Sequence, residues 1–265
     1  MRLRSRSIAL LERPVVVVGT AVVLQWLTTL VVGLRAADVD VGAIELVNVL
    51  ALGPLALTCA YIVARSIGGP ALGAWTLLVW VALPWLAPLY TLASYDQTLR
   101  DDVLPLVVGL TSDEGYAEGV LILAAFTLLA VRRREARAAG AIVAAAVGAL
   151  WLTRAGSTGD LSLDTFQHNM ALLREYFWSN RLLQWAPLAG VIAVGRRSLP
   201  LAAGLGAWLG GYVLFRAAQT GIAFENGEFF RAMLPALPAY ILLTAAIPLL
   251  VPTLAVRLGP LAQRS

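Results

Sequence analysis

The first 42 residues, MRLRSRSIALLERPVVVVGTAVVLQWLTTLVVGLRAADVDVG (residues 1–42), contain the pattern that decides the fold. Four arginines precede an apolar run at 14–34, and Asp38 and Asp40 follow it. A run of about 20 apolar residues is long enough to cross the hydrocarbon core of a membrane as a helix. Because positive charge near the ends of spans stays on the cytoplasmic side, we expect this run to begin inside the cell and to emerge outside it.

The same alternation of charge continues along the whole chain. Arginine-rich gaps alternate with acidic gaps, and the apolar runs between them predict eight spans, at 14–34, 44–64, 71–93, 117–131, 138–153, 182–195, 199–217 and 231–252. An even number of spans places both termini on the cytoplasmic side, where 13 of the 20 arginines and only two of the 16 acids then lie. The sequence therefore predicts an all-α, multi-pass helical bundle in the cell membrane, forming one domain over 1–265.

Composition agrees with a membrane protein. The chain is 59% hydrophobic and 14% charged, and its mean hydropathy is +0.78, whereas soluble domains carry about 25% charged residues. The high isoelectric point reflects arginines that set orientation and contact anionic head groups, so it does not indicate nucleic-acid binding. The lone Cys59 excludes an internal disulfide, and no Cys/His spacing for a metal is present. The first run is longer than the core of a signal peptide, so we expect it to stay as a helix.

The longer segments assigned to the outer face, at 94–116, 154–181 and 218–230, are where a water-exposed site would be built. Within the second of them, Ser162 is expected to begin a helix that runs to about residue 178. Apolar residues at steps of three and four give this helix one apolar face, formed by Leu163, Phe166, Met170, Leu173 and Phe177. We expect an amphipathic helix lying on the outer surface of the membrane.

Several outer residues have two interpretations, which the sequence leaves open. Asp96, Asp101 and Asp102 supply oxygen ligands for a divalent cation, or they form a solvated acidic loop. The only histidine, His168, serves as an outer-face base, or it is a surface residue with an ordinary hydrogen bond.

Two charged residues near span ends, Glu45 and Arg216, also have alternatives. Glu45 caps the start of its helix, or it faces a cavity. Because charged groups at membrane depth usually find a partner, a contact between Glu45 and Arg216 is a further expectation.

Three stretches of the chain resemble the GT-C superfamily of membrane glycosyltransferases, which use polyprenyl-phosphate sugars. They are the first span with the acidic pair after it, the segment LLQWAPLAGVIAVGRR at 182–197, and FFRAMLPALP at 229–238. The last two are similar to bacterial and archaeal relatives of the protein-mannosyltransferase group. The resemblance implies that Asp38 or Asp40 is the catalytic acid, and that Arg231 binds the lipid phosphate. It also implies a polyprenyl-phosphate sugar as donor on the outer face. Asp96, Asp101, Asp102 and His168, on the same face, are further candidates for substrate binding.

Two other functional classes compete with this enzyme. The first outer loop, at 35–42, is much shorter than in the resembled family, and this favours a non-catalytic membrane subunit that pairs with another membrane protein. A transporter ranks last, because the centres of the spans hold almost no ionisable residues and no internal repeat is visible.

Overall fold

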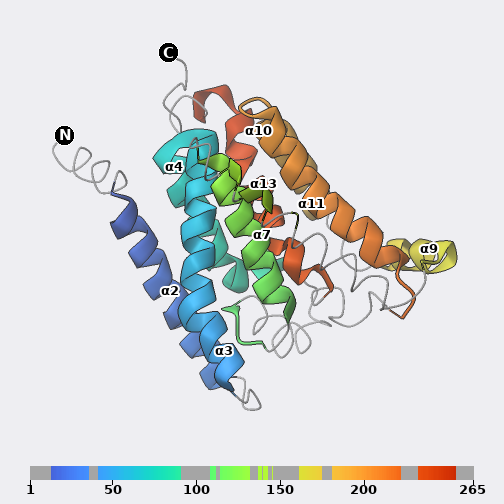
Figure 1. Cartoon of the computed structure of the whole chain (residues 1–265), viewed down its shortest axis with the longest axis horizontal. Helices are drawn as coiled ribbons and strands as arrows, with labels where there is room; N and C mark the ends of the chain where they lie inside the picture. The colour runs from blue at the N-terminus through green and yellow to red at the C-terminus, as the bar shows by residue number, and fades with distance from the viewer. Residues whose placement is uncertain are drawn as a thin grey trace.

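The computed structural model is a bundle of helices (Figure 1). It describes residues 13–35, 41–90, 108–111, 114–131, 137–138, 140–142, 145, 161–174, 181–221 and 232–254. In this part of the chain all regular secondary structure is helical, and the only β-type pairing is an isolated bridge between Leu161 and Gln219. The all-α prediction is confirmed for these residues.

The helices fall where the apolar runs predict them. Their bounds are α2 Pro14–Arg35, α3 Ala43–Val47, the π-helix η1 Asn48–Leu52, α4 Gly53–Tyr90, α7 Glu114–Ala130, α9 Leu163–Leu172, α10 Arg181–Gly195, α11 Leu199–Ala218, the 3-10 helix η5 Leu234–Ala236, α13 Leu237–Ala246 and the 3-10 helix η6 Ile247–Leu250. Of the run at 138–153, the structure describes only 138, 140–142 and 145, all helical.

Three apolar stretches are long enough to cross a membrane: Pro14–Leu34, Ala43–Ala82 and Leu199–Ala218. The middle one is not straight, because the backbone leaves helical geometry at Gly68 and Gly69. Gly69 has a φ of 84°, in the left-handed region that glycine adopts without a steric penalty. The break falls in the gap between the runs predicted at 44–64 and 71–93, and α4 is a helical hairpin rather than one rod (Figure 1).

The two arms of the α4 hairpin can pack closely because a glycine on one arm leaves room for a tyrosine ring on the other. The ring of Tyr61, which is buried, lies against Gly73, where a Cβ atom would come within 2.7 Å of two ring carbons. Close approach of this kind over small residues is how helices pack when lipid removes the usual hydrophobic drive between them.

Helix α2 has one face buried against the protein and an opposite face that is apolar and exposed. One stripe at helical spacing (Ala21, Gln25, Thr28 and Val32) is buried, mainly on the side of α4, the main packing partner of α2, and Val32 packs against Val49 and the segment at 108–110. The opposite stripe is exposed and apolar: Val23, Leu27, Leu30 and Leu34. An apolar stripe along a whole helix is suited to lipid contact and would promote aggregation in water.

Many of the charged residues lie at the ends of the helices, and these ends gather at two ends of the bundle. In Figure 1 the start of α2, the break in α4, the turn between α10 and α11, and the end of η6 all lie at one end of the bundle. We call it the arginine end, because these points carry Arg13, Arg65, Arg196 and Arg197. The starts of α3 and α7 and the end of α11, with α9 beside it, lie at the other end. We call it the acidic end, because the described carboxylates belong to these elements: Glu45, Glu114, Glu118 and Asp164.

Candidate functional site

Most residues that the sequence singles out fall outside the described part of the chain. These are Asp38, Asp40, Asp96, Asp101, Asp102 and Arg231. His168 is described: it is exposed on α9, at the acidic end. Among the described residues, no group of three or more His, Cys, Asp or Glu side chains lies close enough to hold a metal ion.

The expected contact between Glu45 and Arg216 is wrong. Glu45 turns back toward the start of its own helix, where its Oε2 would lie 2.8 Å from a Cβ atom at Gly42. Gly42 is the N-cap and Glu45 the third helical residue, which is where an acidic side chain interacts favourably with the free N–H groups of a helix start. Glu45 therefore lies where the capping interpretation places it, although its carboxylate makes no cap hydrogen bond, and Arg216 has other partners.

Those partners form a chain of polar side chains between α7 and α11, which we call the Arg216 cluster: Glu118, Tyr212, Arg216 and Gln219. The Tyr212 hydroxyl donates to Glu118 Oε1 at 2.8 Å. The guanidinium carbon of Arg216 lies 5.7 Å from the centre of the Tyr212 ring, within range of a cation–π interaction. Arg216 Nη1 donates to Gln219 Oε1 at 2.9 Å.

Helix α9 closes the end of α11 beside this cluster. The last carbonyl groups of an α-helix have no partner inside the helix and need one from elsewhere. Asn169 Nδ2 donates to the Ala217 oxygen at 3.0 Å, and the Ser162 amide donates to the Ala218 oxygen at 2.9 Å. The cap on α11 is thus supplied by a segment about 50 residues distant in the chain.

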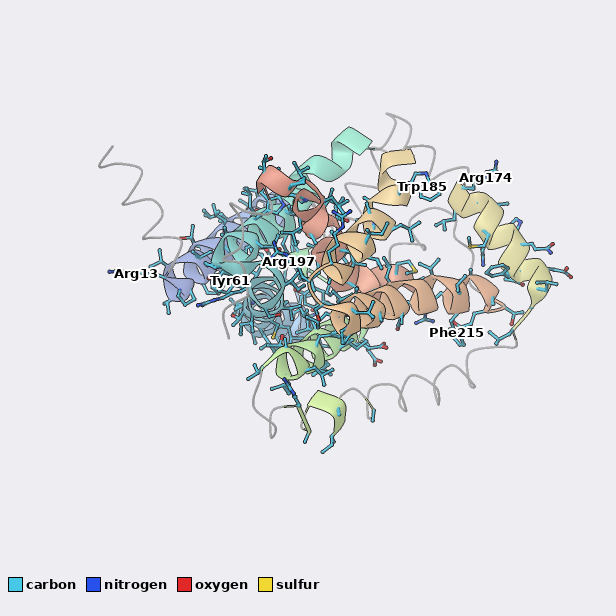
Figure 2. The ribbon with its side chains drawn as sticks, turned by 90° about the horizontal axis from the view of Figure 1, so that it is seen from above. Arg13, Tyr61, Arg174, Trp185, Arg197 and Phe215 are labelled. Carbon is cyan, nitrogen blue, oxygen red and sulfur yellow. The ribbon has the colours of Figure 1, made fainter. Side chains whose placement is uncertain are left out.

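The sequence correctly predicts the start of α9 and describes its apolar face incompletely. Ser162 is the N-cap, and its hydroxyl accepts from the Thr165 amide at 3.3 Å. Phe166, Met170 and Leu173 pack in a cluster with Ala217 of α11, so this face meets protein. Leu163, expected on the same face, is 69% exposed. In Figure 2, Arg174 of α9 and Phe215 of α11 lie on the side of the molecule away from Arg13.

Arg216 lies in a partly buried, polar environment. Tyr212 and Gln219 are buried, and Arg216 is half-buried. Its Nε atom is buried and meets no acceptor. Among the described residues, the guanidinium contacts an amide oxygen and an aromatic ring, both uncharged. A guanidinium stays charged under all ordinary conditions, and the acidic member of the cluster, Glu118, is joined to it through the Tyr212 side chain rather than by direct contact.

A second polar group joins α2 to the start of the α4 hairpin. The Trp26 indole donates to the Val49 oxygen at 3.0 Å, inside the π-helix η1. Asn48 Nδ2 donates to the Thr111 oxygen at 2.6 Å. A π-helix weakens the regular backbone ladder, so a carbonyl there is free to accept from a neighbouring helix. These bonds connect helices to one another, and we assign them to packing.

Sequence reasoning identified one member of the Arg216 cluster and missed the others. Tyr212 and Arg216 are four residues apart on α11, a spacing that places two side chains on one helix face. That signal was present in the sequence. The pairing with Glu118 and Gln219 was not, because it depends on how α7 and α11 pack and on where α11 ends. Comparison of the chain with protein-family models, curated proteins and solved structures gives no match.

Proposed function

We propose that the chain is an eight-span protein of the cell membrane with both termini in the cytoplasm, and that it transfers a sugar from a polyprenyl-phosphate donor on the outer face. The observation that carries the proposed orientation is that the described carboxylates all belong to one end of the bundle, an end to which Arg174 and Arg216 also belong; the proposed sugar transfer rests on the resemblance to the GT-C superfamily. Arg13, Arg65, Arg196 and Arg197 belong to one end, and the described carboxylates belong to the other. Arginines retained inside make the acidic end the outer one.

The direction of the described helices supports the count of spans. In Figure 1, α2 runs toward the acidic end, and the two arms of the α4 hairpin run in opposite directions. Helices α7, α10 and α13 run toward the arginine end, and α11 runs away from it. One further crossing between α7 and α9, from the run at 138–153, makes this alternation complete.

The proposed chemistry assigns two roles at the outer face. A carboxylate, Asp38 or Asp40, takes the proton from the acceptor hydroxyl as the glycosidic bond forms. The bond between the sugar and the phosphate breaks, and the lipid phosphate leaves with its electron pair. Arg231 stabilises the charge that develops on that phosphate. Asp96, Asp101, Asp102 and His168 remain proposals for substrate contacts on the same face.

A sugar-transfer assay on the purified full-length chain tests the reaction. Membrane-extracted protein is supplied with polyprenyl-phosphate sugars and an acceptor alcohol, and the released lipid phosphate is measured. We expect the double variant Asp38→Asn/Asp40→Asn to lose turnover, because the amide cannot accept the proton.

The matched control is Asp164→Asn, which removes an exposed carboxylate from α9 on the same face. It should keep full turnover. Turnover that survives in the double variant would remove this mechanism. A wild-type chain that copurifies with a second membrane protein and shows no transfer of its own would favour the non-catalytic subunit.

A further inference from the structure

We propose that residues 108–111 form a plug at the acidic end of the bundle, and that this plug opens to admit water to three buried polar side chains, Gln25, Asn48 and Tyr116. The plug is a short stretch of mostly non-helical backbone inserted between α2, η1 and α7. The inference does not rest on sugar transfer, because it uses none of the proposed catalytic residues.

The plug is buried although most of it is not helical. Val108 and Leu110 are 1% and 7% exposed, and they pack with Val32 of α2 and Val49 of η1. Gly109 turns the chain with a φ of 82°, which glycine adopts without a steric penalty. At membrane depth, irregular backbone is tolerated only where protein covers it or where it lines a water-filled space. The plug therefore seals a position that would otherwise be hydrated.

Polar side chains from three elements surround the plug. Asn48 Nδ2 donates to the Thr111 oxygen at 2.6 Å and ties the plug to η1. The Tyr116 side chain lies against Gly109, where a Cβ atom would come within 3.2 Å of the ring and 3.3 Å of the hydroxyl. Gln25 of α2 lies beside the same Tyr116 side chain. These contacts connect the plug to a polar interior.

The plug lies nearer the acidic end than Gln25 does. Helix α2 runs toward that end (Figure 1), and its contact with the plug, at Val32, comes about two turns after Gln25. Helix α7 begins at the same end, and Tyr116 lies in its first turn. The direct route along α2 from the proposed outer face to Gln25 therefore passes the plug.

The closed arrangement leaves polar atoms unsatisfied. Gln25 and Tyr116 are 5% and 6% exposed, and among the described residues neither Gln25 Oε1 nor the Tyr116 hydroxyl has a hydrogen-bond partner of acceptable geometry. Burial of such atoms costs free energy, and water entering behind the plug would recover it. The apolar cluster that holds the plug is small and separate from the main core. Opening should therefore cost less than unfolding of the bundle.

Cysteine accessibility in intact cells tests the opening. The reporter is Gln25→Cys, and the native Cys59, which is 5% exposed in the main core, reports general loosening in the same molecule. A membrane-impermeant methanethiosulfonate reagent is added outside, and labelled peptides are quantified by mass spectrometry. We expect Gln25→Cys to react faster than Cys59, because opening of the plug hydrates only the first of them.

Loosening the plug should accelerate this reaction. We expect Leu110→Ala to raise the rate at Gln25→Cys by about tenfold or more, which corresponds to roughly 1.4 kcal/mol, because the closed state loses a buried side chain. Asn48→Asp should act in the same direction, since a carboxylate of equal size cannot donate to the Thr111 oxygen. The matched control is Leu34→Ala, which removes an exposed leucine from α2 at the same end and should leave the rate unchanged. Unchanged gel-filtration behaviour checks that each variant is folded.

A second reporter controls for depth in the membrane. Leu27→Cys lies on the exposed apolar face of α2, near the level of Gln25, and should stay unlabelled because lipid rather than water covers it. The plug is overturned if Gln25→Cys reacts no faster than Cys59, or if Leu110→Ala and Asn48→Asp match Leu34→Ala. Reaction only from the side opposite to the one that labels Leu163→Cys overturns it as well. Turnover is not the readout, so loss of the catalytic proposal leaves this test unaffected.

Discussion

At the scale of single residues, buried polar side chains in this protein connect elements that are distant in the chain. Asn169 is fully buried, and its amide bonds to a main-chain oxygen of α11. Thr127 of α7 bonds to its own helix at Leu123 and reaches the Cys59 oxygen of α4 at 3.3 Å. Where lipid surrounds the bundle, such bonds are an important source of specificity between helices.

Replacing Asn169 should weaken the contact between α9 and α11. We expect Asn169→Leu to lower the free energy of unfolding by about 1–3 kcal/mol, because a buried bond is lost and the Ala217 oxygen loses its donor. The measurement is the unfolding midpoint of purified protein as a mild detergent is replaced by a denaturing one. Gln167→Leu is the control: Gln167 is exposed on the same helix, and its replacement should change the midpoint little.

At the scale of elements, α10 and α13 approach each other closely at a glycine. Gly190 of α10 lies directly against the main chain of α13 at Leu243, where a Cβ atom would overlap the backbone. Gly119 of α7 lies against Pro235 in η5, where a Cβ atom would come within 3.1 Å of main-chain atoms. These glycines let α10 and α7 reach the C-terminal helices, which carry much of the buried core.

The contact between α10 and α13 predicts that replacing Gly190 and replacing Gly211 have different effects on stability. Gly190→Ala should destabilise the protein by several kcal/mol, since backbone rather than a flexible side chain must move. Gly211→Ala should be neutral or slightly stabilising, because nothing lies within 4 Å of its Cβ position and alanine favours a helix. Melting temperatures in the same detergent measure both. Equal losses in the two variants would contradict the close approach of α10 and α13.

The elements were largely predictable from the sequence, for a physical reason. Apolar runs broken by arginines, prolines and glycines locate helices, and the break at Gly68–Gly69 follows from Gly-Gly-Pro at 68–70. Pairing between helices was not predictable, because apolar faces resemble one another. The Glu45–Arg216 expectation failed for this reason: two charges near span ends were paired without knowledge of which helices are neighbours.

At the scale of the whole molecule, the proposed orientation in the membrane predicts which positions can be labelled from outside the cell. Because the chain has a single cysteine, an engineered cysteine can be detected with little background. Cys59 is 5% exposed, so the native thiol should react little. Leu163 on α9 and Leu199 at the start of α11 are 69% and 73% exposed, at opposite ends of the bundle. In intact cells a membrane-impermeant maleimide should label Leu163→Cys, and it should label Leu199→Cys only after permeabilisation.

The control is the Cys59→Ala background, which removes the remaining native signal. Labelling of Leu199→Cys in intact cells, with Leu163→Cys protected, would reverse the assigned orientation. The Arg216 cluster would then face the cytoplasm, and sugar transfer outside the cell would lose its support.

The glycine pair in α4 has a consequence for how this chain fits its environment. The apolar stretch Ala43–Ala82 has 40 residues, and at about 1.5 Å per residue an unbroken helix of that length would measure roughly 60 Å. The hydrocarbon core of a bilayer is only about 30 Å thick. The break at Gly68 and Gly69 therefore divides a rod that is twice too long into two arms, 43–67 and, continuing to the end of α4, 70–90, each of about the right length to cross once.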